Sequence, residues 1–365
     1  MIQFFDIYKQ DKKIHKHLLD DIIKLFKKGD FILGKPVSRF EKNFSKFCGV
    51  KYAISCGNGT DALTIALKSL NLPNNSEVII PAMTYCSTAF SIINANLKPV
   101  LVDLSKLKST IDVDQIKKKI TKKTKVILPV HLYGSVANLK EIKKIIGKKK
   151  IYLIDDCAQA HGAYDDSLNN CKKRIGSSAD ISCFSFYPGK NLGAYGDAGM
   201  ITTNSKKFYN IIKKIRNLGS DKKFMHNYVG LNSRLDSIQA LVLNRKIKNL
   251  DNLNKKRQKI AKIYLKKIIN KKITKLNYSK NCVFHQYVIL TKKRNKLINL
   301  FKKNKIQYGL HYPKTIYQLS ALKKYFGNQK LKNSEIIANN GISIPIDPNL
   351  KKNEINKIIK VINNL

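Results

Sequence analysis

Lys190 is the residue of this sequence whose type and surroundings most directly suggest chemistry. It lies within SCFSFYPGKNLGAYGDAGMITTN (residues 182–204), between two apolar runs that we expect to be strands, roughly Ile181 to Phe186 and Ala198 to Thr203. The nearby glycines, which allow positive φ and a close approach of backbone to a ligand, are Gly189, Gly193, Gly196 and Gly199. A lysine on such a turn can lose its proton by desolvation and attack a carbonyl, as Schiff-base lysines do. Ser185 can offer a hydroxyl to an anion, although the stretch alone also fits a surface hairpin with a solvated lysine.

A second candidate is the glycine-rich turn in YAISCGNGTDALTIALKSLNL (residues 52–72). A short strand leads through Gly57, Asn58, Gly59 and Thr60 into an apolar helix that we expect to begin at Asp61. Such a turn presents free backbone N–H groups and the positive end of the helix dipole, so it can bind an anion, most often phosphate. The turn is neither a Walker loop nor a GxGxxG motif. Taken alone, it is also consistent with an ordinary strand-to-helix turn.

These residues must be positioned by the elements around them, and from residue 77 the sequence alternates apolar strands with helices. Strands without polar interruption, separated by helices, favour a parallel sheet covered on both faces. Ligands of such sheets bind at the carboxyl ends of the strands. The polar and aromatic residues that fall there are Tyr85, His131, Asp155, Asp156 and Gln159. A carboxylate there can keep a pyridinium cofactor protonated, and an aromatic ring can stack on it. Each residue by itself also fits a side chain that caps the following turn.

The length of the chain and a change of pattern near residue 240 predict two domains. With 365 residues, 43% of them hydrophobic, the chain can bury more than one core. Helical spacing predicts one helix over residues 12–28 that ends at Gly29, and another that ends near Gly49. A long lysine-rich helix is expected from Asp236 to Ile269, followed by an α+β layout. We therefore expect a large domain over residues 1–248 and a smaller one over residues 249–365.

Several classes of protein are disfavoured by composition. The sequence has no run of about 18 uncharged apolar residues, and its first residues lack the order of a signal peptide, so we expect a soluble, cytoplasmic protein without membrane contact. The cysteines form no CxxC pair, which predicts reduced thiols and no metal site. They are Cys48, Cys56, Cys86, Cys157, Cys171, Cys183 and Cys282.

The net charge of +46 raises the possibility of nucleic-acid binding. However, the lysines are spread along the whole chain, as on solvated helix faces, and no basic motif interleaved with aromatic residues concentrates them. We therefore expect no nucleic-acid partner.

Taken together, these features are specific for one family of enzymes. The sequence resembles the DegT/DnrJ/StrS family of sugar-nucleotide aminotransferases, which use pyridoxal 5'-phosphate and have the fold-type I architecture, over essentially its full length. The matching words are GNGTDAL, PAMTYCSTA, PVHLYG, IDDCAQAHGA, FSFYPGKNLGAYGDAG and GLNSRLDSIQA. The resemblance implies an α/β fold with a mostly parallel central sheet, helices on both faces and a smaller C-terminal α+β domain.

The resemblance also assigns roles to residues. It makes Lys190 the Schiff-base lysine and proton shuttle, and Asp156 the partner of the pyridinium nitrogen. Gln159 is placed near the ring hydroxyl and Tyr85 against the ring. The residues that it implies for the phosphate are Gly59, Thr60, Asp61 and Ser185. Asn232 is expected to reach the phosphate from the neighbouring subunit, which implies a homodimer with a shared active site.

The expected reaction moves an amino group, with glutamate as the implied donor, onto a keto-sugar nucleotide in the biosynthesis of amino sugars for cell-surface polysaccharides. A dehydratase branch of the family has histidine in place of this lysine, so transamination is favoured. The sequence looks most like members that aminate carbon 3 of a dTDP- or UDP-linked sugar, and carbon-4 amination or a non-catalytic regulator is the alternative. His285, His311 and Tyr312 resemble residues of the sugar-nucleotide pocket. Arg234 is a candidate for a sugar carboxylate, or for an ion pair with an acid such as Asp236.

Overall fold

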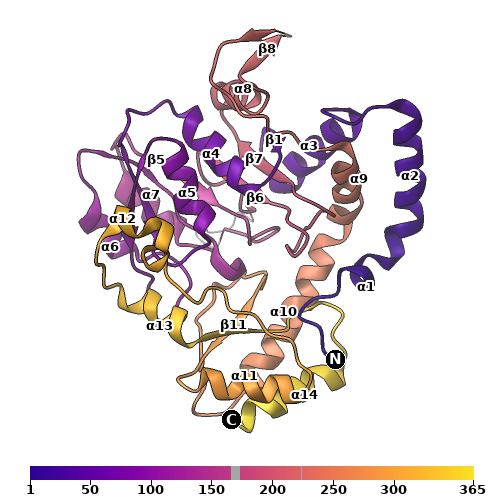
Figure 1. Cartoon of the computed structure of the whole chain (residues 1–365), viewed down its shortest axis with the longest axis vertical. Coiled ribbons are helices and arrows are strands. Elements are labelled where there is room, and N and C mark those ends of the chain that lie inside the picture. The colour runs from indigo at the N-terminus through magenta and orange to yellow at the C-terminus, as the bar shows by residue number, and fades with distance from the viewer. Residues whose placement is uncertain (166–172, 223) are drawn as a thin grey trace.

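The computed structural model describes residues 1–165, 173–222 and 224–365 (Figure 1). Its larger part is built on a seven-stranded sheet in the order β1-β7-β6-β5-β4-β2-β3. The strands are β1 (Tyr52–Cys56), β2 (Glu77–Pro81), β3 (Lys98–Val102), β4 (Thr124–Ile127), β5 (Tyr152–Asp156), β6 (Ile181–Ser185) and β7 (Gly199–Thr203). Only β7 runs against its neighbours, because it returns directly from β6 through the turn that contains Lys190. The prediction of a mostly parallel sheet is confirmed.

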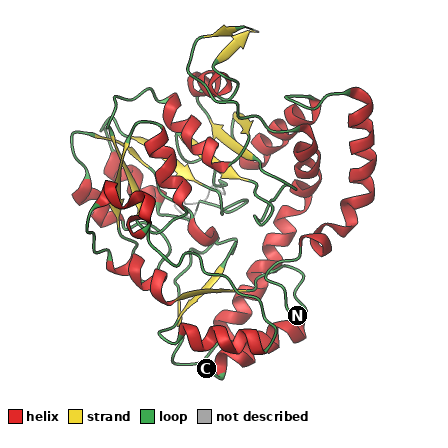
Figure 2. Cartoon of the chain, in the orientation of Figure 1, coloured by secondary structure: helices red, strands yellow, loops and turns green. Residues whose placement is uncertain are grey.

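Helices cover both faces of this sheet (Figure 2). They are α3 (Lys35–Cys48), α4 (Gly59–Ser69), α5 (Cys86–Asn94), α6 (Val113–Lys119), α7 (Leu139–Ile146), α8 (Lys206–Ile215) and α9 (Ser237–Lys246). Successive residues of one strand enter different cores: Ile154 packs with α4, whereas Leu153 belongs to the cluster that contains Phe40 and Phe44 of α3. The strands are apolar without alternation because both of their faces are buried.

The N-terminal helices follow the predicted pattern at their ends. A short α1 (Ile7–Asp11) and a 3-10 turn (Lys12–Ile14) precede α2 (His15–Lys28), which stands at the edge of the molecule (Figure 1). Both α2 and α3 end at a glycine in the left-handed conformation, Gly29 at φ 65° and Gly49 at φ 72°. A residue with a Cβ adopts that conformation at a cost, which explains why glycine stops these helices.

The expected helix from Asp236 to Ile269 is interrupted. Helix α9 is followed by a 3-10 turn, Ile247–Asn249, and then by α10 (Leu250–Lys267). The lysine-rich pattern continues across the interruption, so periodicity gave no sign of it. Helix α10 leads away from the large sheet into the lower part of the molecule (Figure 1).

A second, smaller core lies around a three-stranded antiparallel sheet. Its strands are β10 (Thr274–Lys275), β11 (Tyr287–Leu290) and β12 (Gly341–Ile344), and helices α10, α11 (Arg294–Lys303) and α14 (Lys352–Asn363) contribute to its core. Ile2 joins this core by pairing with Ile306. The region of α12 (Lys323–Phe326) and α13 (Lys332–Asn340) instead packs into the core of the large sheet. A division after residue 248 therefore remains a prediction.

Three smaller features complete the description of the fold. Within the described residues no helix has the length and apolar character that a membrane crossing requires. Five of the six described cysteines are buried, Cys86 is partly exposed, and Cys171 lies outside the described residues. The hairpin of β8 (Ser220–Lys222) and β9 (Met225–His226) projects from the body at the top of Figure 1.

Candidate active site

A cavity of about 1240 Å³ opens where the carboxyl ends of the parallel strands face the smaller core. Most residues singled out from the sequence line it. They are Gly59, Thr60, Asp61, Tyr85, Asp156, Gln159, Ser185, Lys190, His285, His311 and Tyr312. The strand-end residues meet here because parallel strands all finish on one edge of the sheet.

The turn that carries Lys190 is fixed from both sides. The Lys190 N–H donates to the carbonyl of Tyr187 at 2.8 Å, and a Cβ on Gly193 would lie 2.3 Å from the carbonyl oxygen of Pro188, so the turn closes only around a glycine. The next residue, Asn191, is buried and donates to Oδ1 of Asn254 and to the carbonyl of Val283, both at 3.0 Å. Lys190 therefore lies on a tightly held turn and lines the cavity, unlike a lysine on a free surface hairpin.

Burial lowers the pKa of Lys190 from 10.5 to about 8, although the negative charge of Asp156 opposes the shift. The ammonium form loses hydration in the cavity, which favours the neutral amine. Nucleophilic attack on a carbonyl requires the neutral amine, and the lowered pKa makes this form more accessible near neutral pH than in an ordinary lysine.

Asp156 ends β5 and is 6% exposed. Its Oδ1 accepts from the N–H of Ala158 at 3.0 Å, and its Oδ2 accepts from the hydroxyl of Thr88 at 3.1 Å. Burial raises the pKa of Asp156, while the Ala158 N–H, the charge of Lys190 and the Thr88 hydroxyl act in the opposite direction. The side chain is thus a buried carboxyl group in a fixed orientation, able to interact with a cationic ring nitrogen.

The neighbouring Asp155 has a different environment. The ring of His131 accepts from the N–H of Ala137 through Nδ1, so its Nε2 carries the proton and donates to Oδ2 of Asp155 at 3.2 Å. Both side chains are fully buried and neither lines the cavity. The Sγ of Cys157 lies within 4.8 Å of the ligand atoms of both side chains, and burial raises the pKa of this thiol well above the usual value.

The turn before α4 has the form of an anion site. Asn58 caps the helix by accepting from the N–H of Asp61 at 2.8 Å, which leaves the N–H groups of Gly59 and Thr60 for a ligand. A Cβ on Gly59 would lie 2.5 Å from the Cβ of Ser185, so the turn and the end of β6 touch only because residue 59 is glycine. The hydroxyl of Thr60 is 2.7 Å from that of Ser87.

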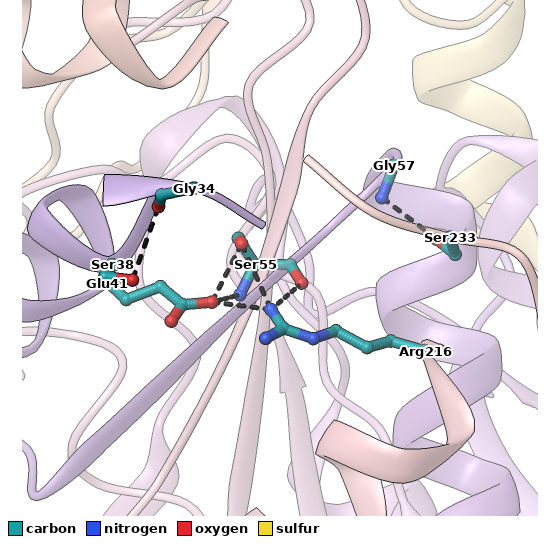
Figure 3. Close-up of polar contacts among 7 residues, drawn as sticks. All are labelled: Gly34, Ser38, Glu41, Ser55, Gly57, Arg216 and Ser233. Atoms are coloured by element: carbon teal, nitrogen blue, oxygen red, sulfur yellow. Dashed lines mark hydrogen bonds and ion pairs between the residues drawn. The ribbon is translucent and has the colours of Figure 1, made fainter. Parts of the chain in front are cut away.

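The sequence did not reveal the role of Ser233, which bonds the turn before α4 from a segment distant in the chain. Ser233 accepts from the N–H of Gly57 at 2.9 Å and donates to Oδ2 of Asp61 at 2.6 Å. Figure 3 shows the contact with Gly57 beside a buried network in which Arg216 donates to Ser55 and pairs with Glu41. The words that carried the resemblance included Ser233, but only the fold brings it to the turn.

The opposite wall of the cavity carries aromatic and amide side chains. Tyr85 is 55% exposed, and its ring centroid lies 5.6 Å from that of Tyr312. Gln159 accepts from the N–H of Tyr133 at 2.7 Å and donates to the hydroxyl of Tyr312 at 3.1 Å. Tyr85 thus offers a free ring face, whereas the amide of Gln159 is held in one orientation by the protein itself.

The smaller core contributes His285 and His311. His285 is buried beside Asn191, and burial lowers its pKa well below the usual value. His311 bonds the hydroxyl of Ser343 through Nδ1 at 2.8 Å, and burial lowers its pKa to about 4. The lowered pKa values favour the neutral form of both rings at pH 7. Phe4 stacks on His311 and lines the same wall, a contribution of the N-terminal segment that the sequence did not reveal.

Asn232 and Arg234 do not line the cavity of their own chain. Asn232 is exposed and pairs with Asn217 across an isolated bridge, and the N-cap of α9 is Asp236, so Asn232 does not cap that helix. Arg234 donates to Oδ1 of Asn217 at 3.4 Å. Both residues lie beside the phosphate turn on the outside of the subunit.

The cavity fits pyridoxal 5'-phosphate in the chemistry of its groups. Lys190, an amine of lowered pKa, lines the cavity and could bond a carbonyl group there. The buried carboxyl group of Asp156 can meet the ring nitrogen, and the N–H groups of Gly59 and Thr60 with the hydroxyl of Ser185 suit a phosphate. Tyr85 supplies a ring for stacking.

Comparison with known proteins agrees with this geometry. The chain is 36% identical to the dTDP-3-amino-3,6-dideoxy-alpha-D-galactopyranose transaminase of Aneurinibacillus thermoaerophilus over 100% of this chain and 99% of that protein. It is 33% identical to the UDP-2-acetamido-2-deoxy-3-oxo-D-glucuronate aminotransferase of Pseudomonas aeruginosa, with 100% of each covered. The crystal structure of S. venezuelae DesV with a ketimine intermediate superposes with a TM-score of 0.95 at 29% identity, covering 100% of this chain and 98% of that one.

A family match covers residues 12–363. The members depend on pyridoxal phosphate, in agreement with the cavity described above. The chain therefore belongs to the DegT/DnrJ/EryC1/StrS aminotransferase family.

Proposed function

We propose that this aminotransferase transfers an amino group from glutamate to carbon 3 of a keto-sugar nucleotide, as a cytoplasmic step in the synthesis of amino sugars for cell-surface polysaccharides. The observation that carries the proposal is the meeting of Lys190, with its lowered pKa, and the buried Asp156 in one cavity with a phosphate-binding turn. The relatives named above act on 3-amino or 3-keto sugars linked to dTDP or UDP, which supports carbon 3.

The roles proposed for the residues follow from their positions. Lys190 holds the cofactor covalently, and Asp156 interacts with its ring nitrogen. The N–H groups of Gly59 and Thr60 and the hydroxyl of Ser185 bind its phosphate. Tyr85 packs on the ring, and Gln159 lies near the ring hydroxyl.

Asp61 contributes indirectly in this arrangement. Its N–H is taken by Asn58 and its carboxylate by Ser233, so it shapes the turn that binds the phosphate. His311 and Tyr312 are proposed to contact the sugar, as neutral groups that donate or accept hydrogen bonds.

Bound pyridoxal phosphate supplies an electron sink that stabilises the carbanion formed next to the amino nitrogen. The neutral Nζ of Lys190 would remove the proton from the α-carbon of the amino donor and would return a proton on the cofactor side of the amino nitrogen. Its neutral form is populated near neutral pH because burial has lowered its pKa, which suits a general base. The same side chain performs the reverse transfers when the keto-sugar is aminated.

We also propose that the enzyme is a homodimer with a shared active site. Asn232 is exposed, lies outside its own cavity and directly precedes Ser233, which accepts a hydrogen bond from Gly57 of the phosphate turn. In the dimer its amide is proposed to donate to the phosphate bound by the partner, and Arg234, two residues further along the chain, is proposed to contact the partner's substrate.

The proposed function is tested by running the reaction in reverse, from the amino-sugar nucleotide and 2-oxoglutarate, because these reactants are more stable than the keto-sugar. Purified protein is incubated with 2-oxoglutarate and a panel of amino-sugar nucleotides that differ in position of the amine (carbon 3 or 4), in nucleotide and in the group at carbon 6. Glutamate formation with a 3-amino sugar and none with Lys190→Ala is the expected result. Preference for 4-amino sugars would contradict the assignment to carbon 3, and absence of turnover with every substrate, despite bound cofactor, would favour a regulator.

A further inference from the structure

Ser233 lies between the chain's own phosphate turn and the segment that carries Asn232. It is 2% exposed. Its hydroxyl oxygen accepts from the Gly57 N–H at 2.9 Å and donates to Oδ2 of Asp61 at 2.6 Å, so a single side chain bonds both ends of the turn (Figure 3 shows the bond to Gly57).

The direction of both bonds is fixed by their partners. A carboxylate only accepts, so the serine proton points to Asp61, and a backbone N–H only donates, so the oxygen lone pair faces Gly57. Asp61 also receives the side-chain N–H of Asn58 at 3.1 Å. Together these two donors hold the carboxylate of Asp61 in place at the start of α4, where a phosphate is proposed to bind.

The backbone around Ser233 is held as firmly as its side chain. Its N–H donates to the carbonyl of Arg216 at 2.9 Å, and the Leu231 N–H donates to the carbonyl of Ile215 at 2.7 Å. Arg216 is itself buried and donates to the carbonyl of Ser55 at 2.7 Å, at the end of β1 (Figure 3). Asn232 is the exposed residue of a segment that is otherwise tied to the strand and turn of its own cofactor site.

We propose that Ser233 is a positioning residue for both cofactor pockets of the dimer. In its own subunit it holds Gly57 and Asp61, and with them the N–H groups that face the phosphate. Toward the partner it fixes the segment from which Asn232 projects. This inference depends on the shared site proposed above, and it adds that the two pockets are mechanically joined through one buried hydroxyl.

The first test measures binding without turnover. Apo-protein is titrated with pyridoxal phosphate and with pyridoxamine 5'-phosphate, which forms no bond to Lys190. Ser233→Ala removes one charge-assisted hydrogen bond and one bond to backbone, and we expect both ligands to bind about tenfold more weakly. Ser69→Ala is the matched control, because Ser69 is also 2% exposed and bonds the Ala66 carbonyl at the far end of the same helix. We expect wild-type affinity for it.

The second test separates the two pockets. Hybrid dimers are purified through two different tags, and Lys190→Ala in one subunit removes the absorbance of lysine-bound cofactor from that subunit. Pairing Lys190→Ala with Ser233→Ala leaves a reporting pocket with a loosened turn and an intact Asn232 from its partner. Pairing the double variant with a wild-type subunit leaves a reporting pocket with an intact turn and Asn232 on a loosened segment. The reference hybrid carries Lys190→Ala alone.

Weaker binding of pyridoxal phosphate in both hybrids than in the reference supports the proposal. Reference affinity in the hybrid of the double variant with wild type would overturn the link between the pockets. An unchanged Ser233→Ala homodimer would overturn the role of Ser233 altogether. A wild-type apo-protein that binds no pyridoxal phosphate would contradict the proposed function, and the role of Ser233 with it, which distinguishes the two failures.

Discussion

The side-chain amide of Asn191 donates to Oδ1 of Asn254 at 3.0 Å, and this bond fastens the turn of Lys190 to helix α10. A second bond from the same amide reaches the carbonyl of Val283 at 3.0 Å. The position of Lys190 is therefore held by helix α10 and by the segment of Val283, and both follow the strands of the large sheet in the sequence.

Asn191→Ala should both destabilise the protein and slow the reaction. Two buried acceptors lose their donor, which costs about 2 kcal/mol in the free energy of unfolding, and Lys190 loses part of its support. Denaturant unfolding and kcat measure the two effects. Asn252→Ala is the control, because the side chain of Asn252 is exposed and donates to the neighbouring Asn249, and the change should alter stability by less than about 0.5 kcal/mol. Equal behaviour of the two variants would contradict a positioning role for Asn191.

The pKa of Lys190 predicts how covalent capture of the cofactor depends on pH. Only the neutral amine attacks, so the rate at which apo-protein binds pyridoxal phosphate covalently should rise with pH and level off above about 8. Because the charge of Asp156 raises the pKa of Lys190, Asp156→Asn should move the midpoint to lower pH. Stopped-flow absorbance gives both profiles. A midpoint near 10.5, the value of an unperturbed lysine, would show that the cavity does not desolvate the amine.

Turnover should depend strongly on the carboxyl group of Asp156. Asp156→Asn keeps the shape of the side chain and can still accept the Ala158 N–H, so cofactor binding should persist. The variant lacks the negative charge that stabilises a protonated ring nitrogen, and we expect kcat to fall roughly a hundredfold. Steady-state kinetics on protein with verified cofactor content measures this loss. Normal turnover would assign the ring nitrogen to another residue.

Much of this site could be predicted from the sequence. The hydrophobic periodicity indicated the strands, and in a parallel sheet the carboxyl ends of the strands lie at one edge, where ligands bind. Asp156 and Ser185 end adjacent strands, β5 and β6, and so meet at one edge of the sheet. Contacts between residues distant in sequence were not predictable. Ser233 reaches Asp61, and Asn191 reaches Asn254, through packing that no local pattern encodes. The interruption between α9 and α10 was missed because the helical pattern itself continues across it.

The ion pair of the buried Arg216 with the partly buried Glu41 should contribute to stability rather than to chemistry. Arg216→Met removes the guanidinium that pairs with Glu41 and donates to Ser55, and leaves those acceptors without their cation (Figure 3). We expect a loss of roughly 3 kcal/mol in the free energy of unfolding. Lys144→Met breaks the exposed pair with Glu141 and should cost less than about 0.5 kcal/mol. Denaturant titration measures the loss of unfolding free energy in the two variants. Equal losses would mean that the pair of Arg216 and Glu41 contributes no more than the exposed pair of Lys144 and Glu141.

The shared active site can be tested with one inactive variant, Lys190→Ala, and one weakened variant, Asn232→Ala. Lys190→Ala abolishes the chemistry of its own pocket, and Asn232→Ala weakens the phosphate site of its partner's pocket if the amide crosses the interface. Asn232 is exposed and absent from its own cavity, so a direct effect within one subunit has no structural basis.

In a hybrid of these two variants, both lesions fall in the pocket of the subunit that carries Lys190→Ala, because the partner of that subunit supplies the altered residue 232. The other pocket has Lys190 from one subunit and Asn232 from its partner, and is complete. Mixing the variants under conditions of subunit exchange should therefore restore activity, up to about half of the wild-type value in each hybrid. Exchange is verified by the recovery of doubly tagged dimers. If doubly tagged dimers form and are no more active than their parents, Asn232 acts within its own subunit and the shared site is excluded.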